Sequence, residues 1–479
     1  MMKQICLFFC LLCATTTLFG QQQVLKNRVI ILTDIENEPD DSESLVRLML
    51  YSNLIDIKGL IATTSVHLMN RVAPESIRHI IDAYGKVYTN LLKHEQGFPK
   101  PSALRGIVKQ GLPVYGMQGV GNGKDSEGSD WIVKVLEEED ERPLWISVWG
   151  GVNTLAQALY KISTQKTPEE ASRLIAKLRV YTISDQDDTG IWIREKYPLL
   201  FYIVSPGGYG NAVWTGMNAV VPQADNKVIS NEWISDNIQQ NHGPLGACYP
   251  DVAYGMEGDT PSWLMLIPNG LNSPEHPNWG SWGGRYEYYK PEYQNLDLQG
   301  YNGGVPIEEE PHPIWTNAID TYYPYVFNEY GKSLRKGNAV SGTTVTIWRW
   351  RTEFQNDFAA RMDWCVKSYS ECNHPPIPVL AHPNRMTVRA GESFWLDASG
   401  TTDPDGDSMT YLWFNYPEAG SYNKVVAIDG AENIYRVRVM APRVKKKETL
   451  HFILKVTDKG NPPLTRYKRV IITVLPPVG

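Results

Sequence analysis

Apolar positions in the first two hundred residues alternate between two spacings, one typical of buried strands and one typical of amphipathic helices. The predicted strands cover residues 29–33, 55–64, 144–149 and 179–184, with a short one near Val114. The predicted helices cover residues 42–50, 74–84 and 129–139, a stretch that begins at Leu155, and residues 344–364. Strands that alternate with helices favour a mainly parallel, Rossmann-like sheet wrapped by helices, which is an α/β fold.

The residue composition and the sequence pattern change twice after this region. Gly, Pro, Asn and aromatic residues dominate positions 205–345, and because long irregular segments are usually functional, we expect these loops to shape a pocket. A proline-rich linker at 373–378 leads into short alternating strands with turn signals, which indicate a small all-β sandwich of immunoglobulin type. We therefore predict a first domain at residues 24–372 and a sandwich at residues 373–479, which either binds carbohydrate or steadies the first domain.

The first twenty residues have the pattern of a secretory signal peptide. Lys3 precedes a short apolar run, and Gly20 provides a small residue at a cleavage point, so residues 1–20 are expected to be removed. The predicted location is secreted or periplasmic. A lipoprotein anchored through Cys10 or Cys13 ranks second, because neither cysteine follows a good lipobox.

Composition narrows the classes of function. Apolar residues make up 42% and charged residues 21% of the 479 positions, which is typical of a globular protein. The net charge is −7 and no stretch is strongly basic, so we expect no nucleic-acid partner, and no run is apolar enough to predict a membrane span. The 15 Trp and 26 Tyr suit stacking on sugars, but aromatic rings also fill cores. The oligomeric state is left open.

Five carboxylates fall within eight residues directly after the first predicted strand. They are Asp34, Glu36, Glu38, Asp40 and Asp41. In an open α/β sheet, ligands bind outside the carboxyl ends of the strands, so this loop lies where chemistry is usually done. So many anions repel one another unless a cation holds them, and oxygen ligands suit Ca²⁺ or Mg²⁺. The alternative is that these residues only cap the following helix.

Weaker signals lie further along the chain. Asp185, with Asp187 and Asp188, follows another predicted strand, where it belongs either to the site or to a solvated turn. The run from Asp403 to Asp407 either binds Ca²⁺ or forms a plain turn. Cys365 and Cys372 either pair in an oxidising compartment or stay two thiols.

The first domain resembles the inosine-uridine nucleoside hydrolase superfamily, which opens with a strand, an Asp-x-Asp-x-x-x-Asp-Asp motif and a helix. The corresponding register here is Asp34-x-Glu36-x-x-x-Asp40-Asp41. Together with the segments 257–262 and 279–285, this run is similar to a branch of secreted bacterial proteins described as cellulose-binding. That branch carries a nucleoside-hydrolase-like domain followed by a β-sandwich.

The resemblance implies a Ca²⁺ site and a reaction. The ligands would be Glu36, Asp41, the backbone carbonyl of Asn153 and Asp259. In the family the metal holds a water molecule that the second motif carboxylate deprotonates and that attacks the anomeric carbon. That role would fall to Glu36, and Asp40 would orient sugar hydroxyls. Glu36 replaces an Asp of the family, so its carboxylate reaches one methylene further.

The function predicted first is a secreted, Ca²⁺-dependent hydrolase of glycosidic bonds, in carbohydrates or N-glycosides. The alternative is a non-catalytic carbohydrate-binding protein that retains the fold, and a third hypothesis is a true nucleoside hydrolase. The residues expected to contact substrate are Asp34, Asp40, His67, Asp185, Trp279, Trp282 and Arg285. The leaving-group acid is left open among His67, Asp185, His242 and His276.

Overall fold

The computed structural model describes residues 25–477, except 223, 324, 328–332, 336–338 and 429–432. The predicted signal peptide, residues 1–20, lies outside the described residues. The strands are β1 (Arg28–Thr33), β2 (Asp56–Ala62), β3 (Val108–Gln110), β4 (Leu144–Val148), β5 (Leu178–Thr182), β6 (Phe201–Val204), β7 (Tyr286–Tyr289), β8 (Ile314–Asn317), β9 (Asp320–Tyr322), β10 (Tyr325–Phe327), β11 (Ser333–Arg335), β12 (Val340–Gly342), β13 (Arg385–Arg389), β14 (Ser393–Asp397), β15 (Met409–Asn415), β16 (Arg436–Met440), β17 (Glu448–Asp458) and β18 (Thr465–Leu475). The α-helices are α1 (Pro39–Tyr51), α2 (Pro74–His94), α3 (Pro101–Gly106), α4 (Glu127–Leu136), α5 (Asn153–Gln165), α6 (Pro168–Ala176), α7 (Thr189–Lys196), α8 (Asn231–Ile234), α9 (Gly243–Gly246), α10 (Pro261–Leu264), α11 (Val345–Trp348) and α12 (Arg351–Asp363).

The first domain is built on an eight-stranded sheet in the order β3-β2-β1-β4-β5-β6-β8-β7. All neighbouring strands in it are parallel except β7, which runs antiparallel to β8 at the edge. The sheet is buried on both faces. Val29 and Ile31 of β1 pack in one apolar cluster with α1, α2 and α12, whereas Ile30 and Leu32 pack in another with α4 and α5. This alternation follows from the two-residue period of a strand.

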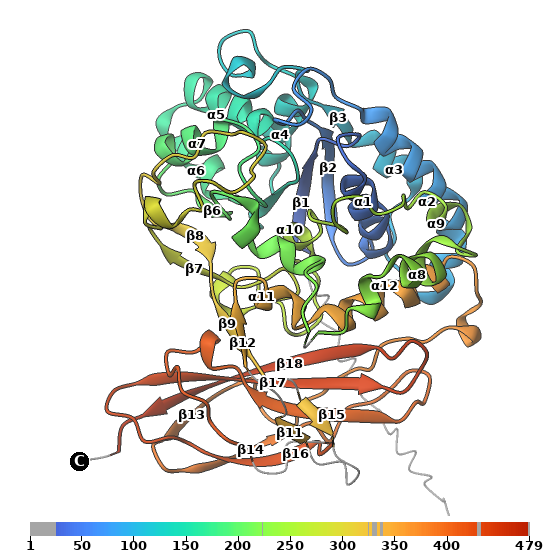
Figure 1. Cartoon of the computed structure of the whole chain (residues 1–479), viewed down its shortest axis with the longest axis vertical. Coiled ribbons are helices and arrows are strands. Elements are labelled where there is room, and N and C mark those ends of the chain that lie inside the picture. Colours follow the sequence, from blue (N-terminus) through green and yellow to red (C-terminus); the bar gives the residue numbers. More distant parts are fainter. Residues whose placement is uncertain are drawn as a thin grey trace, which may run out of the picture.

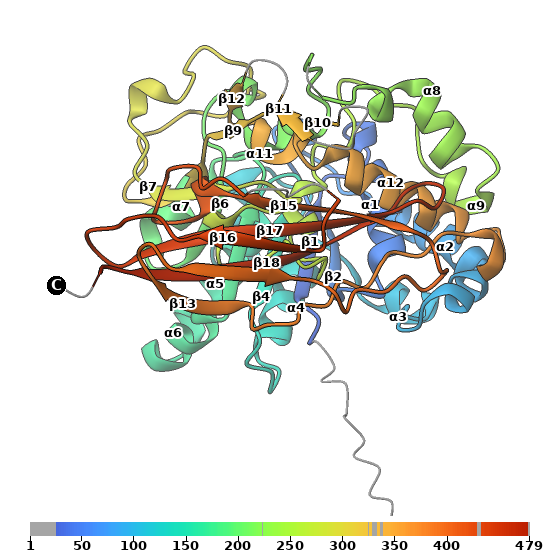
Figure 2. The ribbon, with the colours of Figure 1, turned by 90° about the horizontal axis from the view of Figure 1, so that it is seen from below.

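The C-terminal residues form a four-stranded sheet, β13-β18-β17-β15, and a two-stranded sheet, β14-β16. Figures 1 and 2 show both sheets lying across one end of the first domain. Phe414, Tyr416, Ile453 and Tyr467 of this part belong to the same buried cluster as the first domain's helices. The fold class is confirmed: a mainly parallel sheet with helices is followed by all-β sheets, and the two parts share one continuous core.

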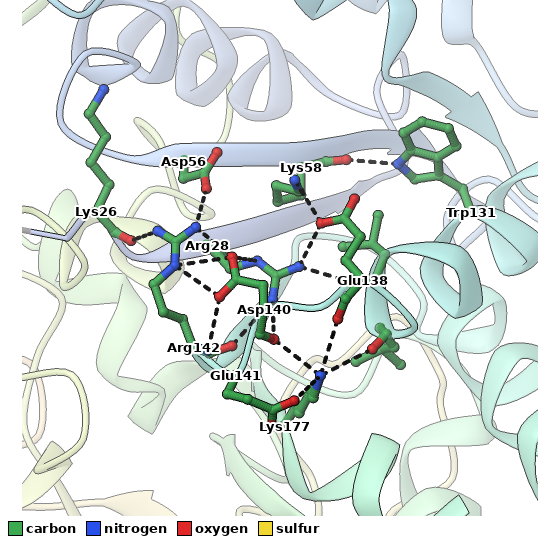
Figure 3. Close-up of polar contacts among 12 residues, drawn as sticks. Lys26, Arg28, Asp56, Lys58, Trp131, Glu138, Asp140, Glu141, Arg142 and Lys177 are labelled. Atoms are coloured by element: carbon green, nitrogen blue, oxygen red, sulfur yellow. Dashed lines mark hydrogen bonds and ion pairs between the residues drawn. The ribbon is translucent and has the colours of Figure 1, made fainter. Parts of the chain in front are cut away.

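Charged residues surround the amino-terminal ends of β1 and β2 (Figure 3). Arg28 is buried and pairs with Glu138 and Asp140, while Arg142 pairs with Asp56 and Asp140. A buried guanidinium costs free energy unless it is paired, and here the loop between α4 and β4 supplies the carboxylates. This network holds the amino-terminal ends of β1 and β2. The acidic loop follows the carboxyl end of β1, at the opposite edge of the sheet.

Several predicted elements differ from the structure in extent. The short strand expected near Val114 is β3 and ends at Gln110, and the single helix expected at 344–364 is divided into α11 and α12. β6, β7 and β8 occupy stretches for which the sequence pattern predicts no strand. Cys365 and Cys372 are free thiols among the described cysteines. Within the described part of the chain, no helix has the length and apolar character needed to cross a membrane.

Candidate functional site: an acidic group and an aromatic cavity

The acidic loop connects β1 to α1, as the strand–loop–helix pattern predicts. Glu38 is the N-cap residue of α1, and Asp40 and Asp41 lie in its first turn. The Glu38 side chain makes no capping hydrogen bond to the described residues. Asp40 Oδ1 accepts a bond of 3.0 Å from the Asp41 N–H. Capping and the helix dipole therefore account for only part of this charge.

Three carboxylates from two distant segments converge at this loop. Asp40, Asp41 and Asp259 each offer one oxygen, and these oxygens all lie within 4.8 Å of one another. Asp259 belongs to the turn that precedes α10, so it is brought to the loop by the fold alone. Asp41 and Asp259 are each 2% exposed. Such a spacing of hard oxygen donors fits a divalent cation of the Ca²⁺ type.

The pKa shifts of these three residues, which we call the acidic trio, also indicate a cation site. Burial raises the pKa of Asp40, of Asp41 and of Asp259 well above the usual range, and the neighbouring carboxylates raise each further. Asp259 Oδ2 is buried and has no hydrogen-bond partner among the described residues. A buried carboxylate oxygen without a donor is costly, and a cation at this point would satisfy it. The residues present therefore fit the Ca²⁺ that the family resemblance implies.

Asp34 lies behind the trio, at the end of β1. It is 2% exposed, and Ser65 Oγ donates a hydrogen bond to its Oδ2. Gly150 passes so close that a Cβ there would lie 2.5 Å from Asp34 Oδ1, so only glycine fits this turn. Burial raises the pKa of Asp34, and the Ser65 bond opposes that shift. Asp34 thus adds negative charge beneath the trio rather than at the cavity surface.

A cavity of about 570 Å³ opens beside Asp40. Its lining combines polar groups with aromatic rings and, among the described residues, belongs wholly to the first domain: Asn37, Glu38, Asp40, His67, Tyr209, Trp214, Thr215, Asn218, Tyr254, Gly255, Gly258 and Tyr301. His67 Nε2 lies 3.4 Å from Tyr209 Oη, and Tyr209 packs edge-on against Tyr301. Tyr254 is 96% exposed at the rim. Carboxylates beside exposed rings are the surfaces expected of a sugar site.

Glu36, predicted as a metal ligand and base, is not part of this trio. Its side chain is 42% exposed, and it pairs with Arg71 and accepts a hydrogen bond from Ser76. Those two bonds hold the pKa of Glu36 below its usual value despite some burial. Its backbone has φ 80°, in the left-handed region that residues other than glycine rarely adopt. This structure therefore does not bring Glu36 into the acidic trio, although its register in the motif predicts that position.

Asn153 and Asp185 have side chains that other residues engage. The Asn153 backbone carbonyl as a metal ligand stays a prediction. The Asn153 N–H donates to Asp187, and its side-chain amide bonds to Thr64 and to the Val114 carbonyl. Asp185 pairs through both oxygens with buried Arg194. Asn153 therefore orders the loops beneath the site, and Asp185 is committed to an ion pair instead of facing the cavity.

Trp279, Trp282 and Arg285 are not at this cavity either. Trp282 is fully buried and its Nε1–H donates to Tyr467 of the sandwich, while Arg285 is 2% exposed and pairs with Asp320. The three residues lie where the sandwich packs on the first domain. The expectation that Trp282 and Arg285 contact substrate is therefore corrected, because their polar atoms are engaged within the core.

The sequence pattern did not single out the residues that form most of the cavity wall. Tyr209, Trp214, Tyr254 and Tyr301 all come from the Gly- and aromatic-rich stretch predicted to shape a pocket, but nothing in that stretch distinguishes them from core aromatics. Glu38 was visible as one of five clustered carboxylates. The structure shows that Glu38 lines the cavity, whereas Glu36 pairs with Arg71.

The fold and the acidic loop define a nucleoside-hydrolase-like α/β protein with a C-terminal all-β part. Residues 28–286 match the family model described as "Cellulose-binding Sde182, nucleoside hydrolase-like domain". Residues 393–474 match "Cellulose-binding protein Sde0182, C-terminal domain". The chain therefore belongs to the Sde182 family of cellulose-binding proteins, as the sequence resemblance predicts.

A solved structure supports this assignment. The chain is similar, with 34% identity and a TM-score of 0.78, to a nucleoside hydrolase-related hypothetical protein from Saccharophagus degradans that is associated with carbohydrate metabolism. The match covers 94% of this chain and 100% of that one. The effector protein XOO4466 matches with 10% identity and a TM-score of 0.32, over 61% of this chain and 88% of that one. No curated protein matches the chain.

Proposed function

We propose that the protein is a Ca²⁺-dependent hydrolase of glycosidic bonds that acts on a carbohydrate outside the cytoplasm. The observation that carries this proposal is the acidic trio, whose oxygens lie within 4.8 Å of one another beside a sugar-sized, aromatic cavity. The nucleoside-hydrolase-like family and the carbohydrate association of the similar structure support it.

In this proposal Asp40, Asp41 and Asp259 hold the cation, and the chain's other groups handle the sugar. A bound Ca²⁺ orients water and sugar hydroxyls and favours deprotonation of the water. Asp40 lines the cavity and accepts hydrogen bonds from sugar hydroxyls. Glu38, which is half-buried, and His67 line the same cavity, and in this proposal Glu38 exchanges a proton with the substrate. Negative charge around the cavity stabilises an oxocarbenium-like transition state.

One observation favours a second candidate function, a carbohydrate-binding protein without catalysis. Glu36 occupies the motif position to which the family resemblance assigns the base, yet it is bound to Arg71 and Ser76. A protein that kept the cation and the aromatic wall but lost this base would bind sugars and release no product. The family description as cellulose-binding fits this candidate equally well.

The experiment that separates the candidates is a product screen with calorimetry in parallel. The panel contains cello-oligosaccharides, aryl glycosides, other cell-wall oligosaccharides, inosine and uridine, each with Ca²⁺ or with a chelator. Chelator-sensitive product supports the hydrolase, and its identity gives the bond cleaved. Free base from inosine or uridine would instead establish a nucleoside hydrolase. Binding without any product would establish the binding protein.

Glu36→Gln is expected to leave Ca²⁺ affinity and sugar affinity within about twofold of wild type, a change of roughly 0.4 kcal/mol. The reason is that Glu36 bonds to Arg71 and Ser76 and lies outside the trio. Calorimetric titration with Ca²⁺ and with an oligosaccharide measures both. If Glu36→Gln lowered the Ca²⁺ affinity as much as Asp41→Asn does, Glu36 would be a Ca²⁺ ligand.

Tyr254→Ala is expected to weaken oligosaccharide binding about fivefold, close to 1 kcal/mol, which is typical of one aromatic contact. Tyr254 is 96% exposed on the cavity rim, so its ring is free for a ligand and contributes little to the fold. Tyr254→Phe keeps the ring and serves as the matched control. Equal affinity of the Ala and Phe variants would remove this ring from the sugar site.

A further inference from the structure

A second cavity, also of about 570 Å³, lies where the sandwich meets the first domain. The first domain contributes Trp279 and the turn around Gly270, and the sandwich contributes the linker after Pro378 and residues of β13 and β18. Among the described residues, this cavity shares no lining residue with the one beside the acidic trio. It is therefore a separate site in the molecule.

The charges that line this junction cavity are all of one sign. Arg385, Lys468 and Arg469 line it, and within the described residues no carboxylate does. Lys468 and Arg385 form no ion pair with any described residue. The whole chain has a net charge of −7, so this local excess of positive charge runs against the molecule's overall field.

Arg469 is the buried member of these three cations, at 7% exposure. Its N–H groups donate to the carbonyls of Leu271 and Gly280 and to His451 Nδ1, which are all neutral acceptors. Burial lowers the pKa of Arg469 to about 10, and burial together with Arg469 and Arg385 lowers that of His451 to about 3. The positive charge of Arg469 is therefore held by neutral dipoles, with no described carboxylate to compensate it.

Trp279 places an aromatic surface beside these cations. The guanidinium carbons of Arg385 and Arg469 lie 5.5 Å and 5.8 Å from the centroid of its ring. The His276 ring stacks on Trp279, with 3.8 Å between the ring centroids. Leu380 and Pro378 complete apolar parts of the wall. The cavity is far larger than an inorganic anion requires, and it combines charge with apolar surface, as ligand sites do.

We propose that the junction cavity binds an anionic sugar unit, in which a carboxylate or sulfate pairs with Arg385, Lys468 and Arg469 and the pyranose lies against Trp279. The Arg385 guanidinium, which forms no ion pair with a described residue, can donate two parallel N–H bonds to such an anion. Arg469 adds its buried positive charge, because most of its N–H groups are already engaged by Leu271, Gly280 and His451. The site is independent of the acidic trio.

The test is calorimetric titration of the full chain with four probes: trigalacturonate, a sulfated disaccharide, cellotriose and inorganic phosphate. Trigalacturonate, the sulfated disaccharide or both should bind, and Arg385→Gln with Lys468→Gln in one chain should weaken that binding at least about tenfold, because two ionic contacts are lost. The matched control is Lys445→Gln with Lys447→Gln, which removes the same charge from an exposed loop and should leave affinity unchanged.

Every other outcome overturns the proposal. Absence of binding by both anionic sugars, equal loss in the control variant, or inorganic phosphate binding as tightly as the sugars would each do so. Asp41→Asn should keep the anionic-sugar affinity of wild type. A failure of the proposed hydrolase, seen as absent product, is thereby distinguished from a failure of this site.

Discussion

Asp259→Asn is expected to lower Ca²⁺ affinity by at least about a hundredfold and to abolish chelator-sensitive product. Even partners outside the first coordination shell commonly contribute factors of ten to a hundred, so removal of a direct ligand should exceed that range. Asp259 contributes an oxygen to the trio, and its Oδ2 has no other partner among the described residues. The amide of Asn cannot replace the charge that holds a divalent cation.

The change in stability caused by Asp259→Asn should have opposite signs with and without Ca²⁺. Burial and the neighbouring Asp40 and Asp41 raise the pKa of Asp259, so in cation-free protein its charge opposes folding. The Asn variant should then be as stable as wild type, or more stable, in a chelator, and less stable in Ca²⁺. Thermal unfolding in both buffers measures this reversal and shows that lost activity does not reflect misfolding.

Asp251→Asn is the matched control, since it changes an exposed carboxylate eight residues earlier. It should bind Ca²⁺ as wild type does. Ca²⁺ titration of all three proteins completes the experiment. If wild-type protein binds no divalent cation, or if Asp259→Asn binds it equally well, the trio is not a metal centre.

Part of this site is visible in the sequence because it is local. Asp40 and Asp41 are adjacent, follow a buried strand and begin a helix, and these features place them at the carboxyl edge of the sheet. Asp259 is more than two hundred positions away, and only the family resemblance connected it to them. The Glu36 side chain pairs with Arg71, a distant residue in the sequence, and no spacing rule predicts that contact.

Trp282 and Arg285 show a second reason why the sequence alone does not predict the site residues. Trp282 and Arg285 have the residue types of a sugar site, but the same types stabilise a buried interface when a partner surface is present. Here Tyr467 of the sandwich accepts the Trp282 N–H, and Arg285 bonds to the Glu418 carbonyl of the sandwich as well as to Asp320 of its own domain. The sandwich was predicted from its strands, whereas the surface that it covers could not be, because that surface depends on packing between distant segments.

Short strands were missed for a related reason. β6, β7 and β8 have four residues each, and they are surrounded by glycine, proline and aromatic residues that also occur in loops. Their place in the sheet comes from pairing with β5 and with one another. The missed strands extend the sheet beyond β5, and the pattern predicts neither these strands nor the residues that form the contact between the two parts.

That contact leads to the second large expected effect. Asp357→Asn should destabilise the protein by about 3 kcal/mol, the lower end of the cost of breaking a buried ion pair. Asp357 of α12 is 3% exposed and lies between Arg361 and Arg466, the latter on β18. Tyr51 Oη also donates to it at 2.7 Å. The variant keeps the shape of the side chain but leaves both guanidinium groups without this carboxylate.

The dependence on pH follows from the Asp357 pKa. Burial alone would raise that pKa, but Arg466 and Arg361 outweigh burial and hold it below 3.8. A lowered carboxyl pKa stabilises the fold above the unfolded value and ceases to do so as pH falls through the folded value. The difference between wild type and Asp357→Asn should therefore be full at neutral pH and should narrow in acid.

Urea unfolding at neutral and acid pH, followed by tryptophan fluorescence, measures both effects. Asp130→Asn is the control, because Asp130 is 53% exposed in its pair with Lys161 and such surface pairs contribute about 0–1 kcal/mol. Since Tyr467 and Phe414 of the sandwich share a core with the first domain, wild type should unfold in one transition. A loss no larger than the control's would mean that Arg466 and Arg361 are satisfied without Asp357 and that other contacts join the two domains.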